Sequence, residues 1–163
     1  INHNLPLELK IKALRRKSGL CIGIAKLIEK GFEVPNSTDG ITLPFFEWQE
    51  ALEEAFKIID EGFELCQQPE TEKIPAPFKR TFSFNGCCAY SLKAEWQTKD
   101  SGLNQPGTIE KIAQKVIPFI RYIKSLDPEQ EHISKLVKDP DFHYLYENSQ
   151  VVNSEINQAT IIA

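Results

Sequence analysis

Histidine and carboxylate side chains are the first place to look for chemistry in this chain, and His132 is the most suggestive of its three histidines. His132 closes an E-x-x-H pattern with Glu129, the spacing by which a helix presents two ligands to a di-iron centre. Such a centre needs two copies of the pattern, and the sequence holds one. Glu129 also follows Asp127-Pro128, where an acidic residue stabilises a first helical turn without any metal. We expect no metal and no cofactor, and a metal-dependent helical-bundle enzyme is the least favoured hypothesis.

Other catalytic patterns are missing. The sequence contains no G-x-G-x-x-G, no G-x-x-x-x-G-K-[ST], no G-x-S-x-G and no H-E-x-x-H, so the commonest nucleotide, hydrolase and zinc sites have no support. His143 lies among aromatic residues and is expected to pack or to contact a partner. A nucleophilic Cys87 or Cys88 paired with a distant histidine stays open, although nothing in the sequence would activate either thiol. We expect buried, reduced cysteines and no enzymatic activity.

Charge is segregated along the chain, although the net charge is only -4. Residues 1–31 carry +5 and residues 73–126 carry +6, whereas residues 44–72 carry -8. Residues 32–43 and 127–163 add -2 and -5. The charges of the segments therefore say more about partners than the total does.

Three groups of basic residues are candidates for contacts to the phosphates of RNA or DNA, which Lys and Arg neutralise. The first is the densest, the second is interleaved with aromatic residues as in single-strand-binding proteins, and the third follows one expected helix. The groups are Lys10, Lys12, Arg15, Arg16 and Lys17; Lys79, Arg80 and Lys93; and Lys111, Lys115, Arg121 and Lys124. The aromatic residues near the second group are Phe78, Phe82, Phe84, Tyr90 and Trp96.

A purely structural interpretation competes with nucleic-acid binding at each group. Surface helices ordinarily carry Lys and Arg, an acidic helix could neutralise the basic ones inside the fold, and the aromatic residues could belong to the core. A pI near 5.5 also argues against a free-standing nucleic-acid-binding protein. Binding as one subunit among several meets that objection.

Hydrophobic periodicity predicts two helices in the first part of the chain, and the first basic group lies on the earlier one. Residues 6–31 are expected to form one bent helix or two short ones, because Ser18-Gly19 interrupts the apolar stripe. That stripe consists of Leu7, Ile11 and Leu14, then Leu20, Ile24, Leu27 and Ile28. Residues 44–67 give the clearest helix, with an acidic opposite face.

The middle of the chain is less clear. Residues 86–98 are expected to form a helix entered through a short extended segment near residues 80–86, although Asn85-Gly86 is also a hairpin signal. Three prolines make residues 68–79 an extended connector. A helix over residues 108–126 should be kinked or split by Pro118.

The remaining segments complete a mainly α, single-domain bundle of about five to six helices over residues 1–147. Two Asp-Pro pairs start short helices over residues 128–137 and 139–146. Residues 34–43 form a loop, and residues 148–163 form a flexible C-terminal tail.

Composition supports a globular protein in the cytoplasm. The apolar share is 41% and the charged share 26%, and no segment approaches the roughly 20 apolar residues that span a bilayer. The start lacks a secretory signal, and a membrane partner is not expected. Met is absent and the chain begins at Ile1, which suggests a lost initiator or a piece of a longer polypeptide.

In size, helical layout and basic helix faces the chain resembles the small helical subunit of CRISPR effector complexes. The resemblance rests on Lys10, Arg15, Arg16 and Lys17 and on the helix from Thr108 to Leu126, and on no diagnostic motif. It implies a non-catalytic subunit in antiviral defence that packs against larger subunits or copies of itself and contributes basic surfaces to RNA or DNA. The second hypothesis is a protein–protein adaptor that binds no nucleic acid.

Overall fold

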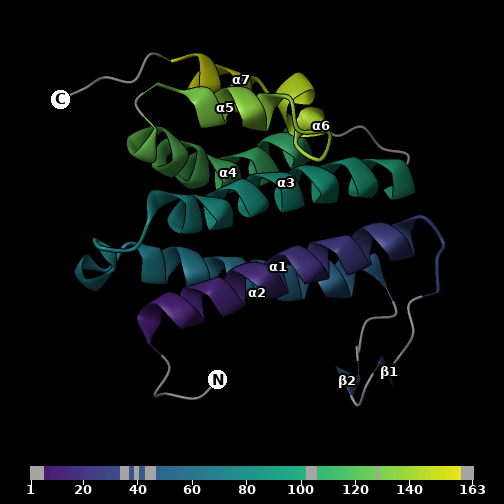
Figure 1. Cartoon of the computed structure of the whole chain (residues 1–163). Helices are drawn as coiled ribbons and strands as arrows, with labels where there is room; N and C mark the ends of the chain where they lie inside the picture. The colour runs from purple at the N-terminus through teal and green to yellow at the C-terminus, as the bar shows by residue number, and fades with distance from the viewer. Residues whose placement is uncertain are drawn as a thin grey trace. The chain divides into compact units, whose positions relative to one another are not determined.

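The computed structural model describes residues 6–33, 37–38, 41–42, 47–101, 106–127 and 129–158, and these are mainly helical, as the periodicity predicted (Figure 1). The elements are α1 (Leu7–Glu29), β1 (Ser37–Thr38), β2 (Ile41–Thr42), α2 (Trp48–Cys66), the 3-10 helix η1 (Pro69–Thr71), α3 (Ala76–Ser101), α4 (Pro106–Leu126), α5 (Glu131–Val137), α6 (His143–Asn148) and α7 (Gln150–Asn157). Within the predicted helical bundle these elements gather into two compact units, residues 1–74 and 75–163.

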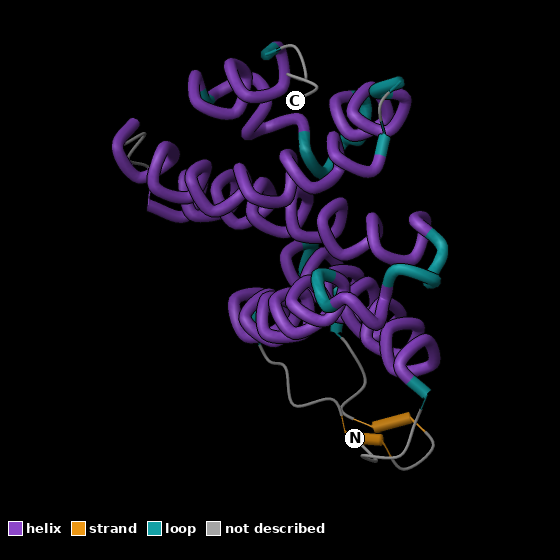
Figure 2. Tube along the Cα trace, turned by 90° about the vertical axis from the view of Figure 1, so that its left-hand side faces the viewer, coloured by secondary structure: helices purple, strands orange, loops and turns teal. Residues whose placement is uncertain are grey.

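The first unit is built on α1 and α2, which pack side by side (Figures 1 and 2). Ile11, Leu14 and Ala25 of α1 are buried with Leu52 and Ile59 of α2. Between these helices, in the predicted loop, β1 and β2 pair antiparallel with Thr38 opposite Ile41. The other residues of that loop from 34 to 43 lie outside the described ones.

Helix α1 runs through Ser18-Gly19 as one helix, so of the two alternatives that the sequence left open, two short helices is wrong. Ser18 is fully buried, and its hydroxyl donates to the carbonyl oxygen of Arg15 at 2.9 Å, so the polar group is satisfied within the helix. The same face of the helix therefore points to the core before and after Ser18. Cys21 and Ala25 continue it into the core, whereas Leu20, which the sequence had assigned to the apolar stripe, is exposed.

Helix α2 begins with a capping box, in which Glu47 and Glu50 each accept a backbone N–H of the first turn. It ends at Cys66, close to the predicted end. The following connector was predicted to be extended and is not: η1 forms a short turn, and the Thr71 hydroxyl donates to the carbonyl oxygen of Cys66 at 2.9 Å.

The second unit contains α3, and the extended segment predicted near residues 80–86 is part of this helix. Pro77 falls in the first turn, where a missing N–H costs little. Gly86 is not a hairpin residue but a packing residue: a Cβ built there would lie 2.8 Å from Cε2 of Phe119 on α4. The close approach of α3 and α4 thus explains the glycine, and the helix predicted over residues 86–98 is confirmed but begins earlier, at Ala76.

Helix α4 passes through Pro118 as a single helix, so the proline does not split it. Pro118 is exposed, and α4 packs against α3, α5, α6 and α7 (Figures 1 and 2). Helix α5 starts later than predicted, after Gln130 with a φ of 57°, and Asp127 accepts the backbone N–H of His132. The contacts on several faces of α4 hold it in the centre of this unit.

The C-terminal segment was predicted to be a flexible tail from residue 148, and its described part is instead helical. Ser149 caps α7 by accepting the N–H of Val152 at 3.2 Å, and Val152 and Ile156 are buried. The sequence did not predict this packing, because the segment is mostly polar and only two of its large apolar residues face the core. Residues 159–163 lie outside the described ones.

Candidate interaction surfaces

The first basic group is largely neutralised within its own unit. Lys10 Nζ lies 3.0 Å from Glu61 Oε1, and Lys17 Nζ lies 2.9 Å from Glu54 Oε1, so both lysines pair with α2. The hydrogen bond to Glu54 raises the pKa of Lys17 against an opposing effect of burial. The acidic helix therefore does neutralise the basic one, as the structural interpretation of the sequence expected.

The other members of this group differ in exposure. Lys12 pairs with Glu8 at 2.6 Å along the same helix, and Arg15 is half-buried. Arg16 is exposed and has no hydrogen bond or ion pair to the described residues. One of the five predicted phosphate contacts is thus left fully available.

The second group does not form the predicted platform of basic and aromatic residues. Lys79, Arg80 and Lys93 are only partly exposed on α3. Phe82 and Trp96 are buried at 0% and 4% exposure, and Tyr90 stacks on Phe119 with ring centroids 6.3 Å apart. Since stacking with bases needs an exposed ring face, at least Phe82 and Trp96 serve the core instead.

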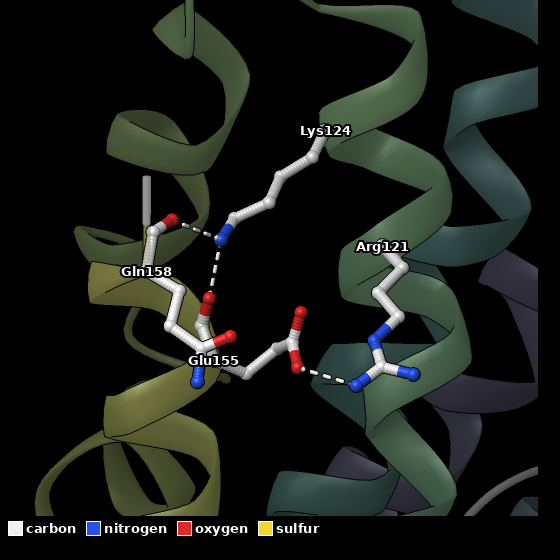
Figure 3. A network of polar contacts seen from close by, with 4 residues as sticks. All are labelled: Arg121, Lys124, Glu155 and Gln158. Atoms are coloured by element: carbon white, nitrogen blue, oxygen red, sulfur yellow. Dashed lines mark hydrogen bonds and ion pairs between the residues drawn. The ribbon is translucent and has the colours of Figure 1, made fainter. Parts of the chain in front are cut away.

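The third group divides between two cations without an ion pair among the described residues and two cations that contact α7. Lys111 and Lys115 are exposed on α4, four residues apart, and make no ion pair with any residue that the structure describes. Arg121 and Lys124 turn toward α7 (Figure 3). Only half of this group is available to an external phosphate.

The contacts of Arg121 and Lys124 hold the C-terminal end of α7 (Figure 3). Arg121 Nη2 lies 2.9 Å from Glu155 Oε2. Lys124 is 6% exposed, and its ammonium donates to the carbonyl oxygens of Glu155 and, at 2.9 Å, Gln158. Burial lowers the pKa of Lys124. A cation at the last carbonyls of a helix satisfies acceptors that have no partner in the helix.

Glu110 fastens the opposite end of α7. Its two carboxylate oxygens accept the Ser149 hydroxyl at 2.8 Å and the Gln150 N–H at 3.0 Å. Sequence reasoning missed the roles of Glu110 and Glu155, because both lie far in the sequence from the groups they bind. Basic residues of α4 predicted for nucleic acid are thus partly structural.

The residues considered for catalysis are not brought together. Among the described residues no three His, Cys, Asp or Glu side chains form a group that could hold a metal ion, so the E-x-x-H pattern gains no further ligands there. His143 is exposed and pairs with Glu147 at 3.0 Å rather than packing among aromatics. All four cysteines are free and buried, as predicted, and burial raises the pKa of the Cys87 and Cys88 thiols.

A surface that sequence reasoning missed lies on the solvent side of α1. Six exposed residues recur along it at alternating spacings of four and three, and we call them the α1 outer stripe. They are Leu9, Ala13, Arg16, Leu20, Gly23 and Leu27. Leu9, Leu20 and Leu27 are 48%, 58% and 46% exposed. This spacing is that of the seam by which one helix packs along another.

The end of α1 extends this apolar surface by one side chain. Gly31, with a φ of 78°, donates to the carbonyl of Ile28 at 2.9 Å, and Phe32 donates to that of Leu27 at 3.0 Å. These two bonds form a Schellman motif, which brings the residue after the glycine back toward the last turn. Phe32 is 60% exposed. It therefore adds an aromatic ring next to Leu27.

The stripe could have been found from the sequence only by treating α1 as continuous. With a break at Ser18-Gly19, Leu20 and Leu27 look like core positions. In an unbroken helix, which turns by about 100° per residue, Leu20 and Leu27 lie on the side opposite Ile11 and Leu14, that is, on the outer face. The decisive signal was thus the buried Ser18, which the sequence does not mark as buried.

In the described part of the chain, no helix combines the length and the apolar character needed to cross a membrane. No protein-family model matches this chain, and no curated protein and no solved structure is detectably similar to it.

Proposed function

We propose that this chain is a helical subunit of a cytoplasmic multi-subunit assembly, and that it docks onto a protein partner through the α1 outer stripe and Phe32. The single observation that carries the proposal is the row of three exposed leucines at seam spacing along one helix face. Exposed apolar residues scattered singly are ordinary, but an ordered row is typical of a contact surface.

The energetics favour a partner that covers this face. Complete burial of a Leu or Phe side chain is worth about 1.5–3 kcal/mol, so covering four half-exposed ones gains about 4 kcal/mol. Part of that gain offsets the loss of rotational and translational freedom on association. The stripe alone therefore supports a specific contact of moderate strength, which further contacts in an assembly would strengthen.

The test compares capture of partners by the tagged chain and by its Leu20→Glu variant from the same host. Loss of a stoichiometric protein with the variant is expected, while helix content and melting temperature stay unchanged because Leu20 is exposed. Glu53→Leu, on the exposed face of α2, is the matched control and should retain the partner. Identical capture by all three proteins would contradict the proposal.

A second candidate function is binding of an RNA or DNA backbone through α4, within an assembly such as a CRISPR effector. The specific observation in its favour is that Lys111 and Lys115 are exposed at adjacent turns and unpaired among the described residues. The cations of α1 contribute less, because Lys10 and Lys17 are already paired.

The second candidate predicts salt-dependent binding of a fluorescent single-stranded oligonucleotide to the chain. Replacing both Lys111 and Lys115 by Glu should abolish the binding or reduce its salt slope by about 1.4, since each phosphate contact contributes about 0.7 for single strands. Lys57→Glu together with Lys73→Glu, at exposed positions elsewhere, serves as the charge-matched control. Equal loss in both double variants would indicate a nonspecific effect of net charge.

A further inference from the structure

We propose that the partner of the α1 outer stripe is an amphipathic helix with acidic residues beside its own apolar stripe. This inference rests on the proposed docking function and adds the chemistry of the partner. Three features carry it: the charge of α1, the positions of two cations that pair with no described residue, and two glycines that no contact among the described residues requires.

The charge on α1 around the stripe is predominantly positive. Helix α1 carries six basic and two acidic residues. Arg16 lies within the stripe, and Lys30, exposed just after the helix, continues its spacing. Neither side chain has an ion pair or hydrogen bond with a described residue. A helix packed along the stripe would meet Arg16 inside the row and Lys30 just beyond its end, and carboxylates facing these two cations are favourable.

The dimensions of the stripe define the length of that partner. Leu9 and Leu27 lie 18 positions apart, so a rise of about 1.5 Å per residue separates them by about 27 Å. Arg16 and Lys30 are separated by 14 positions, or about 21 Å. The partner helix needs about five turns, with carboxylates near one end and near its middle.

Gly19 and Gly23 point to close approach of the partner. Both lie inside α1 and are exposed, and a Cβ built at either would meet nothing within 4 Å. Glycine inside a helix costs about 0.5–1 kcal/mol relative to alanine, and here no contact within the chain's described residues requires it. A second helix backbone passing close to the outer face would use the space that a side chain at Gly23 would fill.

A second copy of this chain fits the stripe poorly. In an antiparallel pairing that places Leu9 opposite Leu27, Lys12 of one copy would lie near Lys26 of the other on the same flank of the stripe, and two basic helices would lie together. Like charges placed next to each other across an interface are unfavourable. The face of α1 therefore favours a partner of the opposite charge.

An anionic membrane also fits poorly. A helix that binds such a surface keeps cations free on its polar side. Lys10 and Lys17 are instead paired with glutamates of α2, and α2 exposes further carboxylates at Glu50, Glu53 and Glu64. A bilayer extends over a much wider surface than one helix does and would come close to these acids as well, whereas a partner helix along the stripe contacts only the outer face of α1 and Phe32.

The test uses the full chain and two fluorescein-labelled helical peptides of about 21 residues. Both peptides carry leucines at alternating spacings of three and four, and the flanking positions are all Glu in one and all Lys in the other. Anisotropy titrations give the affinity of each for the wild type, Arg16→Glu, Leu20→Glu and Lys115→Glu. The last variant is the control, because it makes the same charge reversal as Arg16→Glu in the other unit.

We expect the wild type to bind the Glu peptide about tenfold more tightly than the Lys peptide at about 50 mM salt, with a smaller ratio at about 500 mM. Arg16→Glu should reduce the ratio, Leu20→Glu should remove binding of the Glu peptide, and Lys115→Glu should change neither. Gly23→Leu should also weaken binding, whereas Gly107→Leu, at an exposed glycine of α4 with nothing within 4 Å, should not.

Several results would overturn the inference. They are equal affinity for the two peptides, preference for the Lys peptide, no binding of the Glu peptide up to about 1 mM, a dimer of the chain in sedimentation that Leu20→Glu abolishes, or tighter binding to vesicles containing about a quarter phosphatidylserine. If any of these occurs while Leu20→Glu still loses its captured protein, the docking function stands and only the acidic helix is wrong. If capture is unaffected by Leu20→Glu, the docking function itself fails.

Discussion

Helices α1 and α4 are both amphipathic and basic, yet they use their outward-facing residues differently. In its own unit α1 packs chiefly against α2, and large apolar side chains remain exposed along its outer face. Helix α4 packs against four other helices, and its exposed positions are small or polar, for example Gln114, Lys115 and Ser125.

The cations of the two helices also differ. Lys17 of α1 forms a partly exposed pair with Glu54, whereas Lys124 of α4 is buried and donates to carbonyl oxygens of α7. A basic residue on a helix is therefore an interaction candidate only where no neighbouring helix uses it. Because its apolar outer face is unused, α1 is the helix to test for partners.

The largest expected effect is a difference in stability between substitutions on the buried face and on the exposed face of α1. Leu14 is 2% exposed and Leu20 is 58% exposed. Leu14→Ala should lower the free energy of unfolding by about 2–5 kcal/mol through lost burial and a cavity, while Leu20→Ala should change it by less than about 0.5 kcal/mol. Urea titration followed by circular dichroism measures both.

The two tryptophans allow each unit to be followed separately in this experiment. Trp48 lies in the first unit and Trp96 in the second, and both are buried. In a Trp96→Phe background the fluorescence of Trp48 reports the first unit alone. A large effect of Leu20→Ala on that signal would show that the outer stripe is already covered within the chain.

Two helical glycines should respond to alanine with opposite signs. Gly86→Ala should destabilise by about 1–3 kcal/mol, because the Cβ would overlap the buried ring of Phe119. Gly23→Ala should stabilise by about 0.5–1 kcal/mol, since the site is open and alanine favours the helix. Thermal unfolding of the two variants beside the wild type provides the measurement, and destabilisation by Gly23→Ala would mean that the outer face is occupied.

Removing the buried cation of α4 should loosen α7. Lys124→Met leaves the carbonyl oxygens of Glu155 and Gln158 without their donor, at a cost of about 1–3 kcal/mol. Hydrogen exchange should show the loss first in the amides of α7. Lys115→Met, at an exposed position of the same helix, is the control and should stay within about 0.5 kcal/mol of the wild type. Equal exchange in both variants would contradict the structural role of Lys124.

The smallest expected effect is that the contributions of Lys17 and Lys124 to the stability of the fold change with pH in opposite directions. The pKa of Lys17 is raised above 10.5, so its contribution to stability is complete below pH 10.5 and is lost as the pH rises through the higher folded value. The pKa of Lys124 is lowered, so between that value and 10.5 the unfolded chain binds more protons and stability rises with pH. Unfolding of the wild type, Lys17→Met and Lys124→Met between pH 8 and about pH 11 measures the two differences. The advantage of wild type over Lys17→Met should shrink toward the upper end, and the advantage over Lys124→Met should grow.

The sequence by itself determined the mainly helical class and the approximate positions of most helices, because apolar periodicity follows from the geometry of the helix. It also determined that the cysteines are buried thiols and that the acidic and basic segments could neutralise each other. Pairs such as Lys17 with Glu54 confirm that neutralisation.

Only the tertiary structure decided which signals at Ser18-Gly19, Asn85-Gly86, Pro118 and residue 148 onward would prevail. At three of these places tertiary packing outweighed a local preference: Ser18 is buried in the first unit, Gly86 admits Phe119, and α7 packs on α4. The availability of a cation is decided in the same way, because a charge is used or left free according to which helix packs beside it. Arg16 and Lys124 look alike in the sequence, and packing alone leaves one exposed and makes the other the cap of α7.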